Sequence, residues 1–426
     1  MSREMVVVGA GMVGVSIAWH LQQRGHRVTL VDRREPGRET SYGNAGIIQR
    51  EAVRPYPFPR DLATLMRVAP NRQVDIRYRP SAMMSTVGPL LKYWQNSSAD
   101  RYEKIVPEYA SLISRCLDAH GPMIEAAGAG HLVSRAGWFE VYRTDAGLAA
   151  RAARAREDAQ RFGLNFRVLD GAELASEEPH LSRQLVGAIH WQDPWTVADP
   201  GALVAAYAQA FVNAGGRIVR SEVRSVNRID GGERTDGGGH AGESWKVTTA
   251  DGDLKADEVV MALGPWTQEW LKQFGLSIPL FVKRGYHMHY EHPADKRLCH
   301  WVMDAEVGYL LAPMQAGIRL TTGAELDRLE APPHSSQLAA AERKARRLFP
   351  MGERLEAQAW KGARPCTPDM KPIIGPVPGQ QGLWLACGHG HQGFTLGPVT
   401  GKLLTQMIEG ETPDVDMQPF RVERFS

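Results

Sequence analysis

The first thirty residues contain a short apolar run, a helical pattern and a second apolar run. Residues 5–8, all apolar, are typical of a buried parallel strand, and residues 27–31 predict another. Between them, apolar positions share one face of a helix that Gly25 is placed to end: Val13, Ile17, Ala18 and Leu21. Strand, helix and strand in this order predict a parallel α/β unit.

Patterns further along the chain predict more elements of the same kind. A helix is expected over 199–214, because Asp199 and Pro200 form a start signal and glycines follow the segment. A second helix is expected over 394–409, after a glycine-rich loop. Four short segments predict strands: 217–219, 221–229, 244–249 and 258–263.

A different pattern marks a second domain. Alternation of apolar and polar positions in 281–290 and 309–322 predicts a mixed, largely antiparallel sheet. The glycine-rich stretch 231–242 is typical of a hairpin tip without chemistry. A length of 426 residues suggests two or three domains. We therefore expect an α/β protein in which a Rossmann-like domain is joined to a domain built on the mixed sheet.

The turn after the first strand, residues 9–14, reads GAGMVG and fits the pattern G-x-G-x-x-G. Gly9 permits the tight turn, Gly11 lets the backbone approach a pyrophosphate, and Gly14 lets the helix pack on the strand. The helix N-terminus then faces the phosphate charge. Asp32, after the second strand, is placed to accept a hydrogen bond from a ribose hydroxyl. In this context the turn predicts a dinucleotide site rather than a glycine turn without a ligand.

The glycine turn alone does not identify which dinucleotide binds. Arg33 and Arg34 could meet the 2′-phosphate of NADP. The segment 39–46, ETSYGNAG, favours FAD because it is not the strand–helix unit that a nicotinamide domain needs next. A small, polar segment of this kind can run along an extended ligand and donate backbone N–H groups to it. An ordinary surface loop is the alternative interpretation.

Four motifs in order resemble those of the D-amino-acid oxidase superfamily of flavoproteins, and most of all its bacterial D-amino-acid dehydrogenases (small subunit). They are the turn 9–14 with T-S-x-x-N-A-G at 40–46, then 261–266 (MALGPW), 362–375 (GARPCTPDMKPIIG) and 388–393 (GHGHQG). The resemblance spans nearly the whole chain. It implies FAD as the cofactor and oxidative deamination of a D-amino acid, with hydride transfer from the α-carbon to flavin N5.

Because these motifs lie far apart, the resemblance implies an FAD domain assembled from separated segments: 1–55, 196–275 and 360–426. The intervening segments, 56–195 and 276–359, would form a substrate-binding or interface domain. On this basis we expect the cofactor to contact Gly9, Gly11, Met12, Val13, Gly14, Asp32, Arg33, Thr40, Ser41, Asn44, Ala45, Gly46, Val223, Gly264, Trp266, Gly388, Gly390, Gly393, Phe394 and Thr395.

A substrate carboxylate is best bound by a planar, permanently charged, bidentate partner, which is arginine. Arg364 is the candidate, because Pro365 enforces an extended conformation on it and the family's carboxylate-binding arginine has the matching place. The resemblance implies a substrate-binding tyrosine at Tyr309. Tyr286 and His389 are further candidates for the pocket, with a structural role as the alternative. No side-chain base is expected, since pH can select the neutral amine.

The loop 388–393 leads into the helix 394–409, whose N-terminus carries partial positive charge. Backbone N–H groups of Gly393, Phe394 and Thr395 aimed at flavin N1 and O2 would stabilise the negative charge of reduced flavin. A glycine-capped core helix is the alternative interpretation of this loop.

Two positions depart from peroxide-forming relatives such as monomeric sarcosine oxidase. Those relatives hold the flavin by a cysteine two residues before the Arg364 position, where this chain has Gly362, so we expect non-covalent FAD. They also place a lysine near the flavin where Thr321 aligns. We therefore expect a dehydrogenase that passes electrons to a quinone or an electron-transfer protein. Oxidation of a secondary amine (D-hydroxyproline, sarcosine or opine type), a peroxide-forming oxidase and a non-catalytic FAD-binding relay subunit are alternatives.

Composition narrows the class of protein. A net charge of +2 gives no general attraction to nucleic acid, and no apolar run is long enough to span a membrane. The chain reaches a structural strand at Met5, which leaves no room for a signal peptide. Four scattered cysteines and 14 histidines show no metal-binding spacing, so no metal site is expected. These features predict a cytoplasmic protein.

The stretch 50–95 is basic and apolar, and the predicted chemistry does not account for it. Seven arginines face three acidic residues in its first thirty positions, and apolar residues lie between them. Such a surface could dock on an anionic membrane, at the cytoplasmic face of the inner membrane, or on a partner subunit. A solvated helical face over core residues is the alternative.

Overall fold

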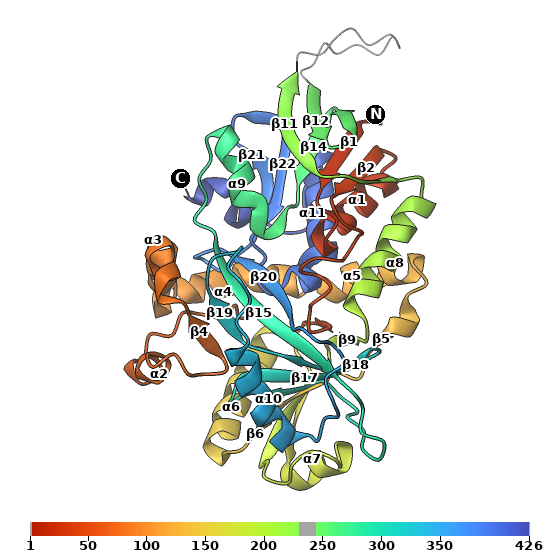
Figure 1. Cartoon of the computed structure of the whole chain (residues 1–426). Coiled ribbons are helices and arrows are strands. Elements are labelled where there is room, and N and C mark those ends of the chain that lie inside the picture. Colours follow the sequence, from red (N-terminus) through yellow and green to blue (C-terminus); the bar gives the residue numbers. More distant parts are fainter. Residues whose placement is uncertain (1, 230–243, 426) are drawn as a thin grey trace.

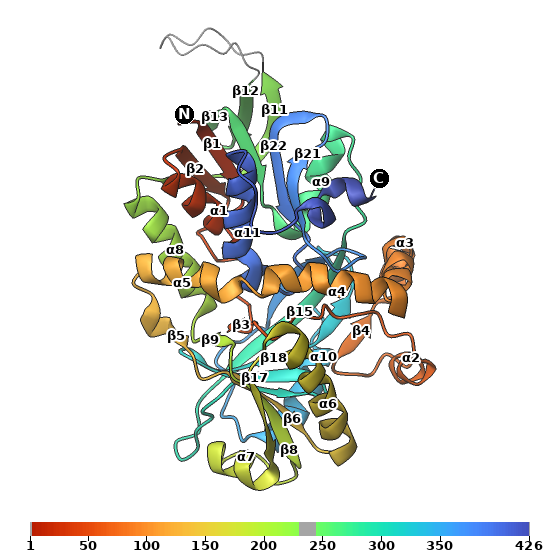
Figure 2. The same cartoon turned by 180° about the vertical axis from the view of Figure 1, so that it is seen from behind.

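The computed structural model describes residues 2–229 and 244–425. Two β-sheets lie one above the other, and a row of helices crosses behind the space between them (Figures 1 and 2). Both chain termini lie in the part that carries the smaller sheet. The predicted class, a Rossmann-like unit joined to a mixed, largely antiparallel sheet, is confirmed.

The smaller sheet has six strands in the order β10-β2-β1-β14-β22-β21. The first five are parallel: β10 (Arg217–Arg220), β2 (Arg27–Asp32), β1 (Glu4–Val8), β14 (Glu258–Met261) and β22 (Gln380–Cys387). The edge strand β21 (Ile373–Val377) is antiparallel to β22. Residues 5–8 of β1 are all buried, as their continuous apolar run predicts.

Three helices cover one face of this sheet: α1 (Met12–Gln23), α8 (Pro200–Asn213) and α11 (Gly393–Ile408). Helix α8 begins where its sequence predicts, because the Asp199 side chain accepts a hydrogen bond from Ala202 N at 2.9 Å and Pro200 follows. Helices α1 and α11 pack closely. A Cβ on Gly401 would lie 2.7 Å from the Ser16 backbone, so only glycine permits this approach. The close packing joins the first and last predicted helices in one core.

The opposite face of the six-stranded sheet packs on a meander of β11 (Val223–Ile229), β12 (Ser244–Thr249) and β13 (Gly252–Ala256). The predicted glycine-rich tip, 231–242, lies outside the described residues. Short helices follow β14: α9 (Thr267–Leu271) and the 3-10 turn Gly264–Trp266.

The larger sheet has ten strands, nine of them in the order β4-β19-β15-β18-β17-β16-β6-β8-β7. Its long strand β15 (Phe281–Tyr290) has the predicted bounds, whereas 309–322 forms two strands, β17 (Tyr309–Met314) and β18 (Gly317–Thr321). The others are β4 (Ile76–Tyr78), β19 (Ala324–Leu326), β16 (Val302–Asp304), β6 (Trp138–Tyr142), β8 (Gly187–Trp191) and β7 (Phe166–Asp170). Helices α6 (Asp145–Phe162), α7 (Gly171–Glu177) and α10 (Ser336–Leu348) pack on this sheet.

Three elements cross the predicted domain boundaries. Strand β20 (Trp360–Cys366) lies in the segment 360–426, yet it pairs antiparallel with β15 of the larger sheet. Helices α4 (Ala99–Ile113) and α5 (Cys116–Ala126) lie in 56–195, yet they pack against α11 of the smaller-sheet part. The division into domains therefore stays a prediction, with these three elements connecting the two parts.

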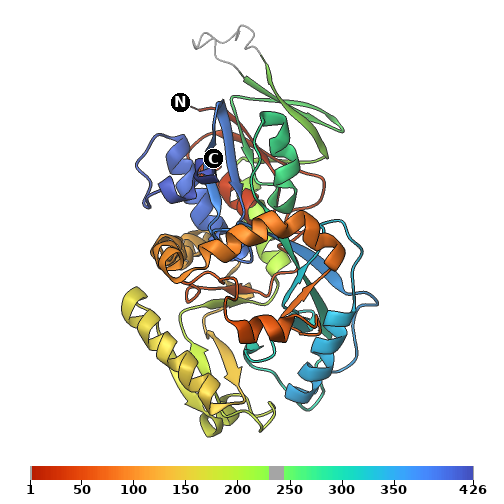
Figure 3. The ribbon, with the colours of Figure 1, turned by 90° about the vertical axis from the view of Figure 1, so that its left-hand side faces the viewer.

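A short sheet of β3 (Ile47–Ile48), β9 (Trp195–Val197) and β5 (Val133–Ser134) connects the two parts. Helices α2 (Leu62–Val68) and α3 (Pro80–Asn96) lie on the outside of the molecule, and Figure 3 shows them in orange facing the viewer. No helix in the described part of the chain is long and apolar enough to cross a bilayer.

Candidate functional site

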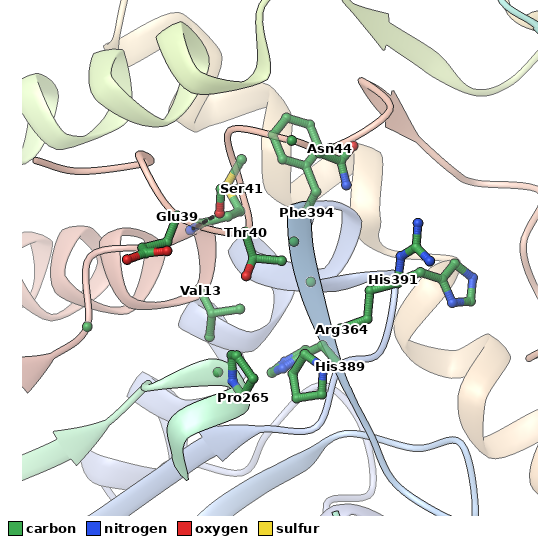
Figure 4. A pocket seen from close by; sticks show the side chains of 18 of the residues that line it. Val13, Glu39, Thr40, Ser41, Asn44, Pro265, Arg364, His389, His391 and Phe394 are labelled. Carbon is green, nitrogen blue, oxygen red and sulfur yellow. Dashed lines mark hydrogen bonds between the residues drawn. The ribbon is translucent and has the colours of Figure 1, made fainter. Parts of the chain in front are cut away.

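A cavity of about 500 Å³ lies between the two sheets. Residues of the glycine turn, of segment 39–45, of the turn that follows β14 and of α11 line one part of it, and residues of β15, β18 and β20 line another. In Figure 4, Val13, Glu39 and Thr40 lie on one side of the cavity and Arg364 with His391 on the other. The site is therefore made where the Rossmann-like part meets the larger sheet.

The glycine turn has the geometry of a phosphate cradle. Gly9 has φ +109°, and a Cβ there would lie 2.4 Å from the carbonyl oxygen of Ala262. A Cβ on Gly14 would lie 1.8 Å from the carbonyl oxygen of Gly9, so this glycine serves helix–strand packing and does not line the cavity. Helix α1 has no acidic residue in its first turn and no side-chain cap. Its positive end thus stays available to an anion.

The end of β2 is arranged for a nucleotide without a 2′-phosphate. Asp32 lines the cavity and accepts hydrogen bonds from Ala10 N (2.7 Å) and Arg34 N (2.9 Å), which leaves lone pairs for a further donor. Glu39 pairs with both Arg33 and Arg34 at 3.0 Å. Because both guanidinium groups already have a carboxylate partner, this geometry favours FAD over NADP.

Segment 39–46 lies along the cavity as the sequence predicts. The Ser41 hydroxyl accepts from Met12 N at 3.0 Å, and the Thr40 hydroxyl donates to the Ala363 carbonyl at 3.2 Å. Asn44 and Ala45 line the cavity beside them. Gly46 does not line it; its φ of +72° turns the chain against the Val197 carbonyl. The segment is a wall of the cavity rather than a free surface loop.

The N-terminus of α11 also meets the cavity. Gly390, Gly393 and Phe394 line it, and the helix has no acidic residue in its first turn. Gly388 and Thr395 do not line it. The Thr395 side chain turns toward β3, where its hydroxyl accepts a hydrogen bond from Gln49 N at 3.2 Å. The partial positive charge of the helix thus reaches the cavity through its first two residues.

Two histidines of the loop 388–393 line the cavity as neutral side chains. Burial lowers the pKa of His389 to about 3, and its Nε2 lies 2.9 Å from the Thr400 hydroxyl. Burial, with the nearby charges of Arg364 and Lys283, lowers the pKa of His391 to about 3. Neither imidazole therefore contributes a positive charge at ordinary pH.

Arg364 on β20 lines the cavity as a cation without a carboxylate partner among the described residues. Within the described structure its one protein acceptor is the Gly323 carbonyl, 3.2 Å from Nη1. The guanidinium rests on Gly285 of the neighbouring strand, where a Cβ would come within 2.5 Å of Nη2. Burial lowers the pKa of Arg364, but an arginine remains protonated under such a shift. The geometry leaves this charge for a ligand.

Trp360, also on β20, occupies the space beside Gly362. A Cβ on Gly362 would lie 1.9 Å from the Trp360 ring, and a Cβ on Gly43 would lie 1.8 Å from the same ring. The indole stacks on His287, with ring centroids 4.8 Å apart and an interplanar angle of 16°. The Trp360 indole therefore occupies the space beside Gly362, the position at which relatives with covalently bound flavin were expected to have a cysteine.

Of the two predicted substrate tyrosines, one lies outside the cavity, and the other lines it with a hydroxyl that already has protein partners. Tyr309 does not line it; its ring is buried in the core under α10, near the ion pair of Arg143 and Asp304. Tyr286 lines the cavity, but its hydroxyl donates to Glu325 Oε2 and accepts from Arg284 Nη2, so it is engaged elsewhere. This placement does not support the predicted substrate contact of Tyr309.

Several lining residues were not predicted from the sequence. Tyr56 is one of them and packs on His391, with ring centroids 4.8 Å apart. Thr321, by contrast, was expected near the flavin; it lines the cavity, and its buried hydroxyl has no partner among the described residues. Others come from loops and from the larger sheet: Gln49, Trp138, Met303, Leu310 and Trp360. Of these unpredicted residues, His391 could have been found from the sequence, because it lies two positions after His389 in the loop 388–393.

Comparison with known proteins agrees with this geometry. The model of a family described as FAD dependent oxidoreductase matches residues 4–407. The chain is 28% identical, over an alignment of 446 residues, to a D-amino-acid oxidase of Bradyrhizobium diazoefficiens, with 99% of each chain covered. It is also 28% identical over 433 residues to a D-amino acid dehydrogenase of Chromohalobacter salexigens, which covers 99% of this chain and 100% of that protein.

Solved structures show the same fold. Glycine oxidase from Geobacillus kaustophilus superposes with a TM-score of 0.70 at 23% identity, covering 99% of this chain and 98% of that one. L-Proline dehydrogenase from P. horikoshii superposes with a TM-score of 0.72 at 18% identity, covering 100% and 98%. These likenesses show the fold and extend over nearly the whole chain.

Proposed function

The chain belongs to the FAD dependent oxidoreductase family, and within it we propose that this enzyme oxidises the amine of a D-amino acid whose carboxylate is held by Arg364. The observation that carries the proposal is a cationic guanidinium in the cavity wall with no acidic partner in the described structure. An unpaired buried charge is costly, so a ligand that brings a carboxylate gains more there than at a solvated site.

The chain's residues fit FAD as a non-covalent cofactor. The turn 9–14 would hold the pyrophosphate, Asp32 a ribose, and the α11 N-terminus the anionic edge of the flavin ring. Gly362 and the adjacent Trp360 leave no thiol for attachment at the position that covalent relatives use. When bound, FAD supplies an acceptor for the hydride from the substrate's α-carbon.

The protein's part in the reaction is to orient the substrate and to favour its neutral amine. Arg364 fixes the carboxylate, while Tyr56, Thr321 and His391 line the same cavity with uncharged groups. None of the lining residues from the larger sheet is acidic, so no carboxylate there holds an ammonium ion. A neighbouring cation and apolar walls both lower the pKa of an amine. The neutral amine is the form from which hydride loss is possible.

We propose a quinone or an electron-transfer protein as the acceptor, rather than oxygen. The support is Thr321, a neutral hydroxyl in the cavity wall where peroxide-forming relatives are expected to have a lysine. A positive charge beside reduced flavin stabilises developing superoxide, and Thr321 cannot supply it.

The test is anaerobic bleaching of the enzyme's flavin absorbance by single compounds. D-amino acids should bleach it, and the amines that lack the carboxylate should bleach it far more slowly. Bleaching by N-alkyl amino acids alone would move the substrate class to secondary amines. Failure of every amino and imino acid to bleach bound FAD would make the chain a relay subunit and refute the proposal.

A further inference from the structure

The exposed apolar side chains of this protein gather in one segment. Eleven large apolar side chains are exposed in the described part of the chain, and eight of them lie between residues 56 and 94. They are Tyr56, Leu62, Leu65, Met66, Met84, Val87, Leu91 and Trp94, with Met84 85% exposed. Scattered exposure of this kind is ordinary, but such a concentration marks an interaction surface. We name the seven that lie on helices α2 and α3 the apolar face.

Helix α3 has apolar side chains on a buried inner side and on an adjoining exposed side, called its outer side. Its inner side packs Leu90 and Tyr93 against Phe281 and Cys366, on the strands that carry Lys283 and Arg364. Its outer side carries Met84, Val87, Leu91 and Trp94, whose spacing of three, four and three residues places them in one stripe. A helix that is apolar on both sides is normally covered on both. No part of the described chain covers the outer side.

Helix α2 extends the same face. None of its residues is buried, although Leu62, Leu65 and Met66 are large and apolar. The start of α2 lies beside the end of α3, because the Arg60 guanidinium lies 3.9 Å above the Trp94 ring and donates to the Trp94 carbonyl. An exposed helix with no buried side chain gains no packing energy from this chain, so its apolar residues have their role in contact with something else.

The face is surrounded by positive charge. Residues 56–96 contain five arginines and one lysine but only two acidic residues. Of those two, Asp61 caps α2 through Thr64 N at 2.7 Å, and Asp75 accepts two hydrogen bonds from Arg67. Arg60, Arg72 and Lys92 are exposed and have no acidic partner in the described structure. The segment thus carries more net positive charge than the whole chain, whose net charge is +2.

We propose that the apolar face is a docking surface for an anionic lipid bilayer. Apolar side chains on a helix, with arginine, lysine and tryptophan at the rim, are the composition of a helix that lies in a membrane interface. A second copy is disfavoured as the occupant, because a two-fold contact would bring two net-positive segments together. The contact is peripheral, since no described helix can span a bilayer.

Docking would place the lipid surface close to the substrate cavity. Tyr56, at the start of the segment, lines the cavity beside His391. On the inner side of α3, Tyr93 accepts a hydrogen bond from Lys283 at 2.9 Å, and Lys283 is the cross-strand neighbour of Arg364. Helix α3 therefore lies between the membrane-facing side of the apolar face and the strands that carry Lys283 and Arg364.

The test is co-flotation of the holoenzyme with vesicles of equal parts phosphatidylglycerol and phosphatidylcholine, against vesicles of phosphatidylcholine alone. We expect binding to the anionic vesicles that weakens in high salt. The variant Met84→Ser/Leu91→Ser should lose roughly tenfold or more in partitioning, and Arg72→Gln/Lys92→Gln roughly tenfold on anionic vesicles only. The matched control is Val168→Ser/Leu355→Ser, two exposed apolar residues outside the face, which should bind like the parent.

Retained FAD and an unchanged melting temperature show that each variant is folded. The proposal fails if the parent does not float with anionic vesicles, or if the control loses as much binding as Met84→Ser/Leu91→Ser. It also fails if the parent binds no vesicles but forms a concentration-dependent dimer, and Met84→Ser/Leu91→Ser converts that dimer to a monomer. The apolar face would then be covered by a second copy of the chain. These outcomes do not depend on which substrate is oxidised.

Discussion

Removing the Arg364 guanidinium should weaken recognition of the carboxylate and little else. In the structure this group makes one contact with a protein acceptor, the Gly323 carbonyl, and has no carboxylate partner among the described residues. Arg364→Ala therefore disrupts no internal ion pair, and FAD should stay bound. A bidentate, charge-assisted contact at such a site is worth about 2–4 kcal/mol, which corresponds to a loss of roughly 30- to 1000-fold in kcat/KM.

A milder change tests the same contact without removing the charge. In Gly285→Ala the new Cβ would come within 2.5 Å of Arg364 Nη2, so the guanidinium must move. We expect KM to rise by roughly tenfold in this variant while kcat changes less, because the positive charge remains but the guanidinium nitrogens are displaced from the carboxylate. Arg364→Lys should lie between the parent and Arg364→Ala, since it keeps the charge and loses the bidentate geometry.

The assay compares each amino acid with the amine that lacks its carboxylate, using an artificial acceptor. Arg364→Ala should reduce kcat/KM for the amino acid and leave that for the amine nearly unchanged, so that the two substrates become similar. The reasoning is refuted if Arg364→Ala, with its FAD retained, distinguishes the two compounds as strongly as the parent does.

Three further predictions follow from the cavity and its surroundings. Acid precipitation should release all flavin into the supernatant, because Gly362 and Trp360 offer no thiol for attachment; colour that stays with the pellet would contradict this. Glu51 lies behind the cavity wall, where its buried carboxyl accepts a hydrogen bond from the Trp138 indole at 3.2 Å. Burial raises the pKa of Glu51 from 4.5 to about 7, so the folded state keeps a proton that the unfolded chain has lost within this window, and stability falls as pH rises through it. Glu51→Gln should thus be more stable than the parent by up to about 3 kcal/mol at about pH 8 and similar to it near pH 4, and a difference independent of pH would refute the assignment. In stopped-flow reoxidation, the reduced parent should react slowly with oxygen and quickly with a quinone analogue, and Thr321→Lys should accelerate the oxygen reaction; a fast, peroxide-forming parent would make the enzyme an oxidase.

Local sequence patterns sufficed for the parts of the site that are built from consecutive residues. The turn 9–14, the acid at Asp32 and the loop before α11 each depend on a short stretch whose glycines and apolar positions determine the backbone path. The bounds of β15 could be predicted for the same reason, since the strand pattern of 281–290 continues without an interruption. These elements contain most of the residues that meet the expected dinucleotide.

The substrate side of the cavity depends on pairings that are remote in sequence. Gly285 supports Arg364 because β15 and β20 pair with Lys283 opposite Arg364, and nothing in either segment alone indicates that register. Tyr309 shows the same limit. Alternation along β17 predicts two faces but not which one meets the cavity, and the structure gives that place to Leu310. A shift of one residue exchanges the faces of a strand.

The central claim is that a D-amino acid, bound through Arg364, gives up its α-hydrogen as hydride to the bound cofactor. It is tested most directly by anaerobic stopped-flow reduction of the flavin with an active D-amino acid and with its α-deuterated form. We predict bleaching of the flavin band in a single turnover, with a clearly slower rate for the deuterated substrate. Bleaching at the same rate with both forms under conditions where reduction is limiting, or no bleaching by any D-amino acid, would contradict it.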